Sequence, residues 1–114
     1  MPEKSVGQIE AALSEAIIRF EREYMGRGPV STRSYLLDNL IVIRLEGVLT
    51  PAEQQLAKDP NGVKLLKDVR TSLIEGAHDT LKSVVRDLTG RRVISMHSDI
   101  SAKTGERIIV FTLE

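Results

Sequence analysis

The chain has 114 residues, enough for one domain with one hydrophobic core and too few for two. Its sixteen basic and sixteen acidic side chains cancel, so no overall charge favours binding to a polyanion or an acidic membrane surface. The absence of cysteine excludes thiolate catalysis, cysteine-bound zinc and disulfides, and it is compatible with a reducing compartment.

The first predicted helix begins after Ser5, because Ser5 and Gln8 have the spacing of a capping box. Apolar residues recur at three- and four-residue steps from Val6 to Tyr24 and form one stripe. The charged residues of this segment, Glu21 among them, are predicted to lie largely outside the stripe. Two glycines and a proline in residues 26–29 end the helix.

Residues 30–37 and 40–46 are predicted to form two strands joined by a tight turn at residues 38–39. Side chains alternate between the two faces of a strand. In the second strand we expect Ile41, Ile43 and Leu45 to face the helices. The other face of the same strand is predicted to carry Val42, Arg44 and Glu46.

Residues 50–53, Thr-Pro-Ala-Glu, combine a capping box with proline at the first helical position and predict a short helix to about Lys58. A longer helical pattern then continues to Leu88, before Gly90. Its apolar stripe is Leu66, Val69, Leu73, Ala77, Leu81, Val84, Val85 and Leu88. This helix would be roughly 40 Å long and a seven-residue strand only about 23 Å. We therefore expect it either to overhang the sheet or to bend near Gly76, and an overhanging apolar end predicts a homodimer.

The last two predicted strands, residues 92–100 and 107–113, are rich in β-branched residues and are joined by a turn that contains Gly105. The side chains predicted to face the helices are Ile94, Met96, Ile109, Phe111 and Leu113. Those predicted on the opposite face are Ser95, His97, Asp99, Ile108, Val110 and Thr112.

The predicted element order is therefore α-β-β-α-α-β-β. This order indicates a two-layer α+β sandwich, with the helices on one face of a mainly antiparallel four-stranded sheet. No internal repeat or linker divides the chain, so we expect a single domain over residues 1–114.

No apolar run approaches the length of a membrane span. The first residues lead into an acidic amphipathic pattern rather than into the apolar core of a secretion signal. We therefore expect a cytoplasmic protein with no integral membrane segment.

His97 and Asp99 are the polar pair with the greatest chemical interest. They are two residues apart on one strand, so their side chains share a face about 7 Å apart at the backbone. One histidine and one carboxylate are too few for a catalytic metal, which needs at least three protein ligands. No serine matches a nucleophile motif. We expect no catalytic residue, no cofactor and no metal, and interpret the pair as structural or as part of an interface.

Several segments of the chain carry a family resemblance. They are residues 26–29 (Gly-Arg-Gly-Pro), 43–53 (Ile-Arg-Leu-Glu-Gly-Val-Leu-Thr-Pro-Ala-Glu), 88–90 (Leu-Thr-Gly), 93–101 (Val-Ile-Ser-Met-His-Ser-Asp-Ile-Ser) and 103–106 (Lys-Thr-Gly-Glu). Together they resemble the MpsC-like family, a bacterial family long catalogued as a domain of unknown function and named for a Na-translocating membrane-potential-generating system. The resemblance implies a non-enzymatic accessory or regulatory component of a membrane cation or bicarbonate transport system. It supplies no catalytic or ligand residue.

A chain without a membrane span can act on ion transport by binding a membrane partner or by passing on a sensed state. We expect such a protein to contact a membrane transport protein from the inner face of the membrane. The predicted contact surface comprises Arg44, Glu46, His97, Asp99, Lys103 and Glu106.

Two other functions stay open at this point. The order α-β-β-α-α-β is that of one type of KH domain, but the Gly-x-x-Gly loop of KH domains is replaced by Asp-Pro-Asn-Gly at residues 59–62. With neutral net charge and few aromatic residues, we expect no nucleic-acid partner. The second alternative is a homo-oligomeric structural adaptor.

Overall fold

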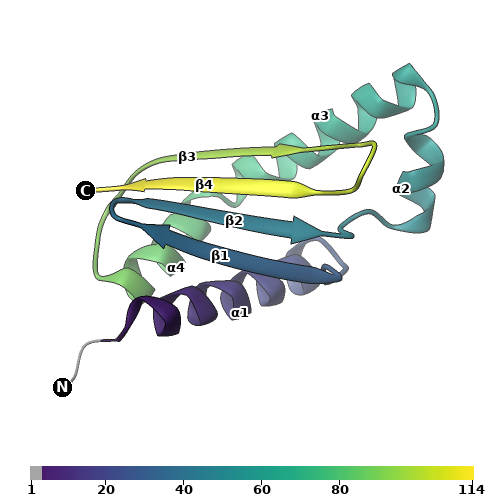
Figure 1. Cartoon of the computed structure of the whole chain (residues 1–114). Coiled ribbons are helices and arrows are strands. Elements are labelled where there is room, and N and C mark those ends of the chain that lie inside the picture. Colours follow the sequence, from purple (N-terminus) through teal and green to yellow (C-terminus); the bar gives the residue numbers. More distant parts are fainter. Residues whose placement is uncertain (1–3) are drawn as a thin grey trace.

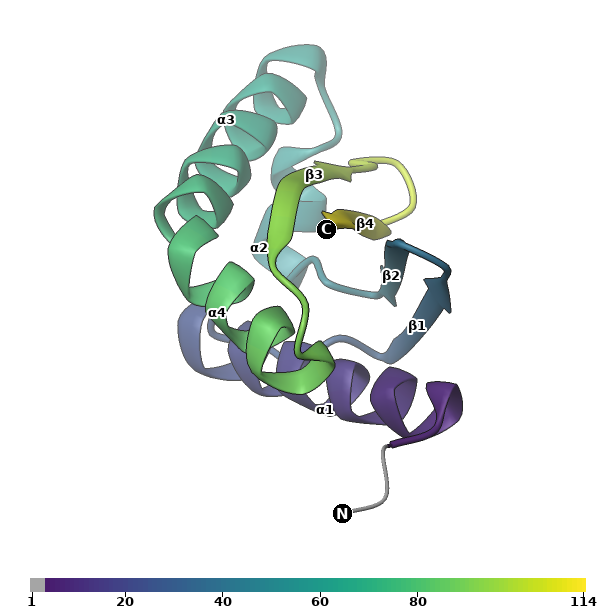
Figure 2. The same cartoon turned by 90° about the vertical axis from the view of Figure 1, so that its left-hand side faces the viewer.

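The computed structural model describes residues 4–114; residues 1–3 of the predicted domain lie outside the described part. Along the chain the elements are α1 (Val6–Tyr24), β1 (Ser31–Leu37), β2 (Leu40–Glu46), α2 (Pro51–Leu56), α3 (Pro60–Gly76), α4 (His78–Thr89), β3 (Val93–Ile100) and β4 (Arg107–Leu113). The strands form one antiparallel sheet in the order β1-β2-β4-β3. Helices α1, α3 and α4 cover one face of this sheet, and α2 lies beyond the strand ends (Figures 1 and 2). The predicted α+β sandwich is confirmed.

Both predicted capping boxes are formed. Ser5 Oγ accepts from the Gln8 N–H at 3.1 Å, and Gln8 Oε1 accepts from the Ser5 N–H at 2.8 Å. Thr50 and Glu53 make the same reciprocal pair, at 3.2 and 3.0 Å. These bonds satisfy N–H groups that have no partner inside the helix, which is why both helices begin where the sequence predicts.

The long predicted helix is bent. It divides at Ala77, where α3 ends and α4 begins, so the expected bend near Gly76 is present. Gly76, the last residue of α3, lies close to the end of α1, since a Cβ there would be 3.3 Å from the Tyr24 hydroxyl. The N-terminal end of α3 also projects beyond the β3–β4 turn (Figure 1).

The core lies between the sheet and the helices. The sheet contributes the predicted alternate residues, all of them buried: Ile41, Ile43, Leu45, Ile109, Phe111 and Leu113. The helices contribute residues at three- and four-residue steps, chiefly Leu13, Ile17, Leu66, Ile74, Leu81 and Val85. Burying these side chains is the main favourable term for the fold, at about 25 cal/mol per Å² of apolar surface.

Two details of the predicted core are wrong. Ile94 is 59% exposed instead of facing the helices, because a bulge between Val93 and Ser95 shifts the register by one residue and buries Val93. On α3, Val69 and Leu73 are exposed as well. The buried flank of α3 instead consists of Gly62, Leu66, Arg70 and Ile74.

Candidate functional site

The sheet face opposite the helices, here called the outer face, is covered by no other part of the described chain (Figure 2). The strand register places Tyr35, Val42, Val110 and His97 in one row across all four strands. Val42 and Val110 are half-buried by their neighbours, and Tyr35 is 41% exposed. The outer face therefore combines apolar rows with polar ends, as predicted from strand alternation.

One corner of the outer face is charged. Arg44 on β2 lies 2.6 Å from Glu106 and 3.5 Å from Glu46, measured from Arg44 Nε to carboxylate oxygens. Glu106 directly precedes β4. Its contact with Arg44 joins two segments that are 62 residues apart in the sequence. Asp99 lies in the same row as Arg44, on the other side of β4, because Ile108 pairs with both Arg44 and Asp99. We call Arg44, Glu46, Asp99 and Glu106 the charged corner.

Asp99 is held at the edge of the sheet by two donors. Its Oδ1 accepts from the Ile100 N–H at 2.8 Å and lies 3.2 Å from Lys67 Nζ, which reaches over from α3. The Ile100 N–H and then Lys67 lower the pKa of Asp99. Because Asp99 is strongly exposed, this pair contributes little to stability. It does set the position of one carboxylate in the charged corner.

The other two residues of the predicted contact surface, His97 and Lys103, lie near the charged corner. His97 is exposed in the row beside Val110, on the same face as Asp99. Lys103 is exposed at the β3–β4 turn. Within residues 4–114 no three histidine, cysteine, aspartate or glutamate side chains lie near enough to share a metal ion. The structure thus brings Arg44, Glu46, Asp99 and Glu106 together, with His97 and Lys103 on either side of them.

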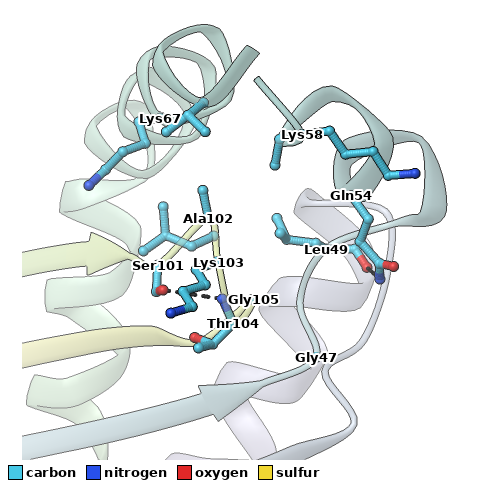
Figure 3. Close-up of a pocket in the computed structure, with 13 residues that line it drawn as sticks. Gly47, Leu49, Gln54, Lys58, Lys67, Ser101, Ala102, Lys103, Thr104 and Gly105 are labelled. Atoms are coloured by element: carbon cyan, nitrogen blue, oxygen red, sulfur yellow. Dashed lines mark hydrogen bonds between the residues drawn. The ribbon is translucent and has the colours of Figure 1, made fainter. Parts of the chain in front are cut away.

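A hollow of about 810 Å³ lies beside the charged corner, between α2, the start of α3 and the β3–β4 turn. Leu49, Val63 and Ile100 supply apolar surface to it. Lys58 and Lys67 line it with their stems, while their ammonium groups point away from it (Figure 3). The turn is braced from within, since Ser101 O accepts from the Gly105 N–H at 2.8 Å. Gln54, Lys103 and Thr104 also line the hollow, which therefore has a mixed polar and apolar surface.

Beneath the sheet lies a buried charge cluster that the sequence analysis missed. Glu21 of α1 is fully buried, with its carboxylate oxygens 3.9 Å from Arg70 Nη1 and 3.7 Å from Arg107 Nε. Arg70 also donates to both oxygens of Glu53, at 2.8 and 2.6 Å, and to the Val48 carbonyl at 3.0 Å. We call Glu21, Glu53, Arg70 and Arg107 the buried charge cluster. It connects α1, α2, α3 and β4.

The prediction that Glu21 lies outside the apolar stripe is wrong, and the sequence holds a weak signal of its burial. Glu21 follows the buried residues Leu13 and Ile17 at four-residue steps. Arg107 likewise alternates with Ile109 and the other inward residues of β4. The positions of Glu21 and Arg107 in the helix and strand patterns therefore predict burial, whereas their charge predicts exposure.

Burial dominates the electrostatics of Glu21. It raises the pKa of the Glu21 carboxyl above the ordinary value of 4.5, although Arg107 and Arg70 oppose the shift. Burial also lowers the pKa of Arg107. In Glu53 burial tends to raise the pKa, but hydrogen bonds from Arg70 and from the Thr50 N–H outweigh it and lower the pKa. Neither Glu21 oxygen accepts a hydrogen bond within the described residues.

A pH dependence follows for Glu21→Gln. Folded Glu21 holds its proton more tightly than unfolded Glu21, so above pH 4.5 the folded state binds more protons and its stability falls as pH rises. The glutamine variant lacks this titration. We expect the free energy of unfolding of wild type, minus that of the variant, to decrease from pH 4.5 upwards until the folded carboxyl has ionised.

Urea unfolding at a series of pH values measures this difference. Glu15→Gln, at an exposed position of the same helix, serves as the control for loss of a carboxylate. A difference that increases with pH would show that the two arginines, not burial, control Glu21.

The protein-family model described as "Na+-translocating membrane potential-generating system (MpsC)" matches residues 5–114. The Bacillus subtilis (strain 168) protein named "Uncharacterized protein YbcI" is 40% identical over 110 residues, covering 96% of this chain and 89% of that protein. "Uncharacterized protein YrhF" of the same organism is 26% identical over 102 residues, covering 89% of this chain and 84% of its own. No solved structure matches the chain.

None of the helices in residues 4–114 combines the length and the apolar character that crossing a bilayer requires. The family model spans all the secondary-structure elements, from the Ser5 cap to the last residue of the chain. On this match the chain belongs to the MpsC family.

Proposed function

We propose that this protein is a non-enzymatic accessory or regulatory component of a membrane cation or bicarbonate transport system, of the membrane-potential-generating kind. It acts through protein–protein contacts, as a cytoplasmic protein at the inner face of the membrane. The family name supports the association with a membrane potential-generating system. The uncovered outer face supports the mode of action.

The observation that carries the proposal is the position of the charged corner beside exposed apolar rows. Protein interfaces commonly combine an apolar centre with a polar rim. Here the centre is formed by Tyr35, Val42 and Val110, and the rim by the charged corner. Arg44 and the carboxylates around it are held by one another, so their arrangement is set before a partner binds and less side-chain entropy is lost on binding.

The mixed charge of this rim favours a protein over a nucleic acid. Glu46, Asp99 and Glu106 are anionic and would repel phosphate groups, whereas a protein partner can present charges of both signs. The junction between α2 and α3, where a KH domain has its Gly-x-x-Gly loop, has the helix-capping Asp59 carboxylate instead.

We also propose that the working unit is a homodimer. Large apolar side chains remain exposed on α3, away from the outer face. A second copy on that side would leave the outer face free for a membrane partner, so the two contacts do not compete.

The partner surface is tested by crosslinking in the native cells, solubilising the membranes and recovering the tagged protein. We expect wild type to recover a polytopic transport protein and both Arg44→Glu and His97→Ala/Asp99→Ala to lose most of it. Arg44→Glu removes the cation of the charged corner and places a fourth carboxylate beside Glu46 and Glu106.

Arg19→Glu is the matched control, since it makes the same charge change at an exposed position of the helical layer. Circular dichroism checks that each variant is folded. Recovery of RNA, or equal recovery of the transport protein by all variants, would contradict the proposal.

A further inference from the structure

The carboxylate of Glu21 lies in the core without a hydrogen bond. Glu21 is 0% exposed, and within residues 4–114 neither of its oxygens accepts from a donor. Two guanidinium groups flank it, with Arg107 Nε at 3.7 Å and Arg70 Nη1 at 3.9 Å, both beyond hydrogen-bond distance. Most buried polar groups are hydrogen-bonded, so an exception calls for a reason. Charge attraction, without hydrogen bonds, stabilises ionised Glu21.

Opposing contributions allow Glu21 to bind and release a proton in the folded protein. The charged groups that act on it are Arg107 from β4, Arg70 from α3 and Glu53 from α2. Burial and Glu53 favour the protonated carboxyl, whereas the two arginines favour the carboxylate. Burial has the largest effect and raises the pKa, so the folded chain changes charge at Glu21 above pH 4.5.

A proton on Glu21 changes the charge balance of the buried charge cluster. With Glu21 ionised, two carboxylates face two guanidinium groups. With Glu21 neutral, Arg70 still has Glu53 at 2.6 and 2.8 Å, but Arg107 keeps no carboxylate at ion-pair distance among the described residues. Arg70 then repels Arg107 without an anion between them. Protonation thus relieves the cost of a buried carboxylate, and it also removes the attraction that holds the Arg107 guanidinium.

Arg107 connects the buried charge cluster to the charged corner. It is the first residue of β4 and directly follows Glu106, whose carboxylate lies 2.6 Å from Arg44 on the outer face. Arg107 Nη1 also donates to Ser98 Oγ at 2.8 Å, and Ser98 directly precedes Asp99 on β3. Two of the three carboxylates of the charged corner are therefore neighbours in sequence of a residue that Arg107 positions, or of Arg107 itself.

We propose that the buried charge cluster is a proton switch for the charged corner. Ionised Glu21 holds Arg107 in place, and the charged corner is then ordered for partner binding. When Glu21 takes up a proton, Arg107 and the start of β4 loosen, Glu106 loses its fixed position against Arg44, and partner binding weakens. This regulation rests on the proposed function, because it acts on the same contact surface. If the partner binds only the ionised form, its affinity falls about tenfold for each pH unit below the midpoint.

NMR spectroscopy of the isotope-labelled full chain over a pH series tests the switch without a partner. The carboxyl carbon of Glu21 reports its proton directly. The Arg44 Nε–H and the amide of Ile108, which pairs with Arg44, report the charged corner. We expect all three signals to shift with one common midpoint above pH 4.5. Glu21→Gln should remove that step from Arg44 and Ile108, and Glu15→Gln, at an exposed position of α1, should retain it.

A second variant separates this signal from titration on the outer face itself. His97→Gln removes the histidine beside the charged corner, and we expect the step at Arg44 to persist there at the Glu21 midpoint, because the signal originates in the core. The test does not depend on the folding of Glu21→Gln, since the wild-type Glu21 carboxyl carbon supplies the midpoint with which the other two signals are compared.

Each result decides a different claim. Arg44 and Ile108 signals that do not change at the Glu21 midpoint, or whose step is lost in His97→Gln, would overturn the switch and leave the proposed accessory function standing. Recovery of the transport protein from solubilised membranes, buffered above and below the midpoint, tests the regulation: we expect it to decline below the midpoint, and equal recovery would overturn the regulation. Recovery of no transport protein at any pH would contradict the proposed function, while NMR still decides the switch.

Discussion

Arg70→Met is expected to lower the free energy of unfolding by about 3–5 kcal/mol. Methionine fills much of the space of the arginine stem but donates no hydrogen bond. The half-buried Glu53 carboxylate keeps only the Thr50 N–H as a donor, the Val48 carbonyl loses its Arg70 donor, and Glu21 keeps only Arg107 as a nearby cation. Removing one member of a buried charge cluster leaves an uncompensated buried charge, which costs much more than the ion pair contributes. Urea unfolding followed by circular dichroism measures the loss.

Lys67→Met is the matched control for Arg70→Met. It makes a similar substitution three residues earlier on α3, but it removes only the exposed pair with Asp99. We expect a loss of less than about 1 kcal/mol. Equal losses in the two variants would show that the buried charge cluster contributes nothing beyond an ordinary surface pair.

Gly62→Ala is expected to lower the free energy of unfolding by about 3 kcal/mol or more. An ideal Cβ at position 62 would lie 1.7 Å from the Leu56 carbonyl oxygen and 2.8 Å from its carbon. These are backbone atoms, so no change of rotamer relieves the clash, and the α2–α3 connection must move. That movement would also disturb the cap in which Asp59 Oδ1 accepts from the Gly62 N–H at 2.9 Å.

Gly7→Ala separates this clash from the general effect of the substitution. Position 7 lies in the first turn of α1 and has no neighbour within 4 Å of an added Cβ. Alanine there should leave stability unchanged or raise it by up to about 1 kcal/mol, through better helix propensity. Chemical denaturation of both variants gives the comparison. A Gly62→Ala protein as stable as Gly7→Ala would mean that α2 adjusts without cost.

The elements could be predicted because their signals are local. The capping boxes at Ser5 and Thr50 need only residues three positions apart, and both helices begin there. The strand ends were predicted to within one residue of Ser31–Leu37 and Leu40–Glu46, since alternation and turn residues act over a few positions. The same alternation correctly placed Arg44 opposite the buried Ile43 and Leu45.

Residue type alone is a poor guide to burial where tertiary contacts decide which side chain is buried. Hydrophobicity alone ranks Val69, not Arg70, as the buried residue of this pair. In the folded chain Arg70 is the buried one, since Glu53 and the Val48 carbonyl meet its guanidinium. The bulge between Val93 and Ser95 also depends on a tertiary contact, because pairing with β4 sets the register of β3.

The sequence by itself determined the order of elements, the two hairpins, the helix starts and which strand residues form the outer face, because these depend on neighbours a few positions away. Only the tertiary structure decided that Arg44 meets Glu106, that Lys67 reaches Asp99 and that Glu21 lies buried between two arginines. These partners are separated by between 32 and 86 positions in the chain. Their proximity arises from packing the helices on the sheet, and no local propensity encodes it.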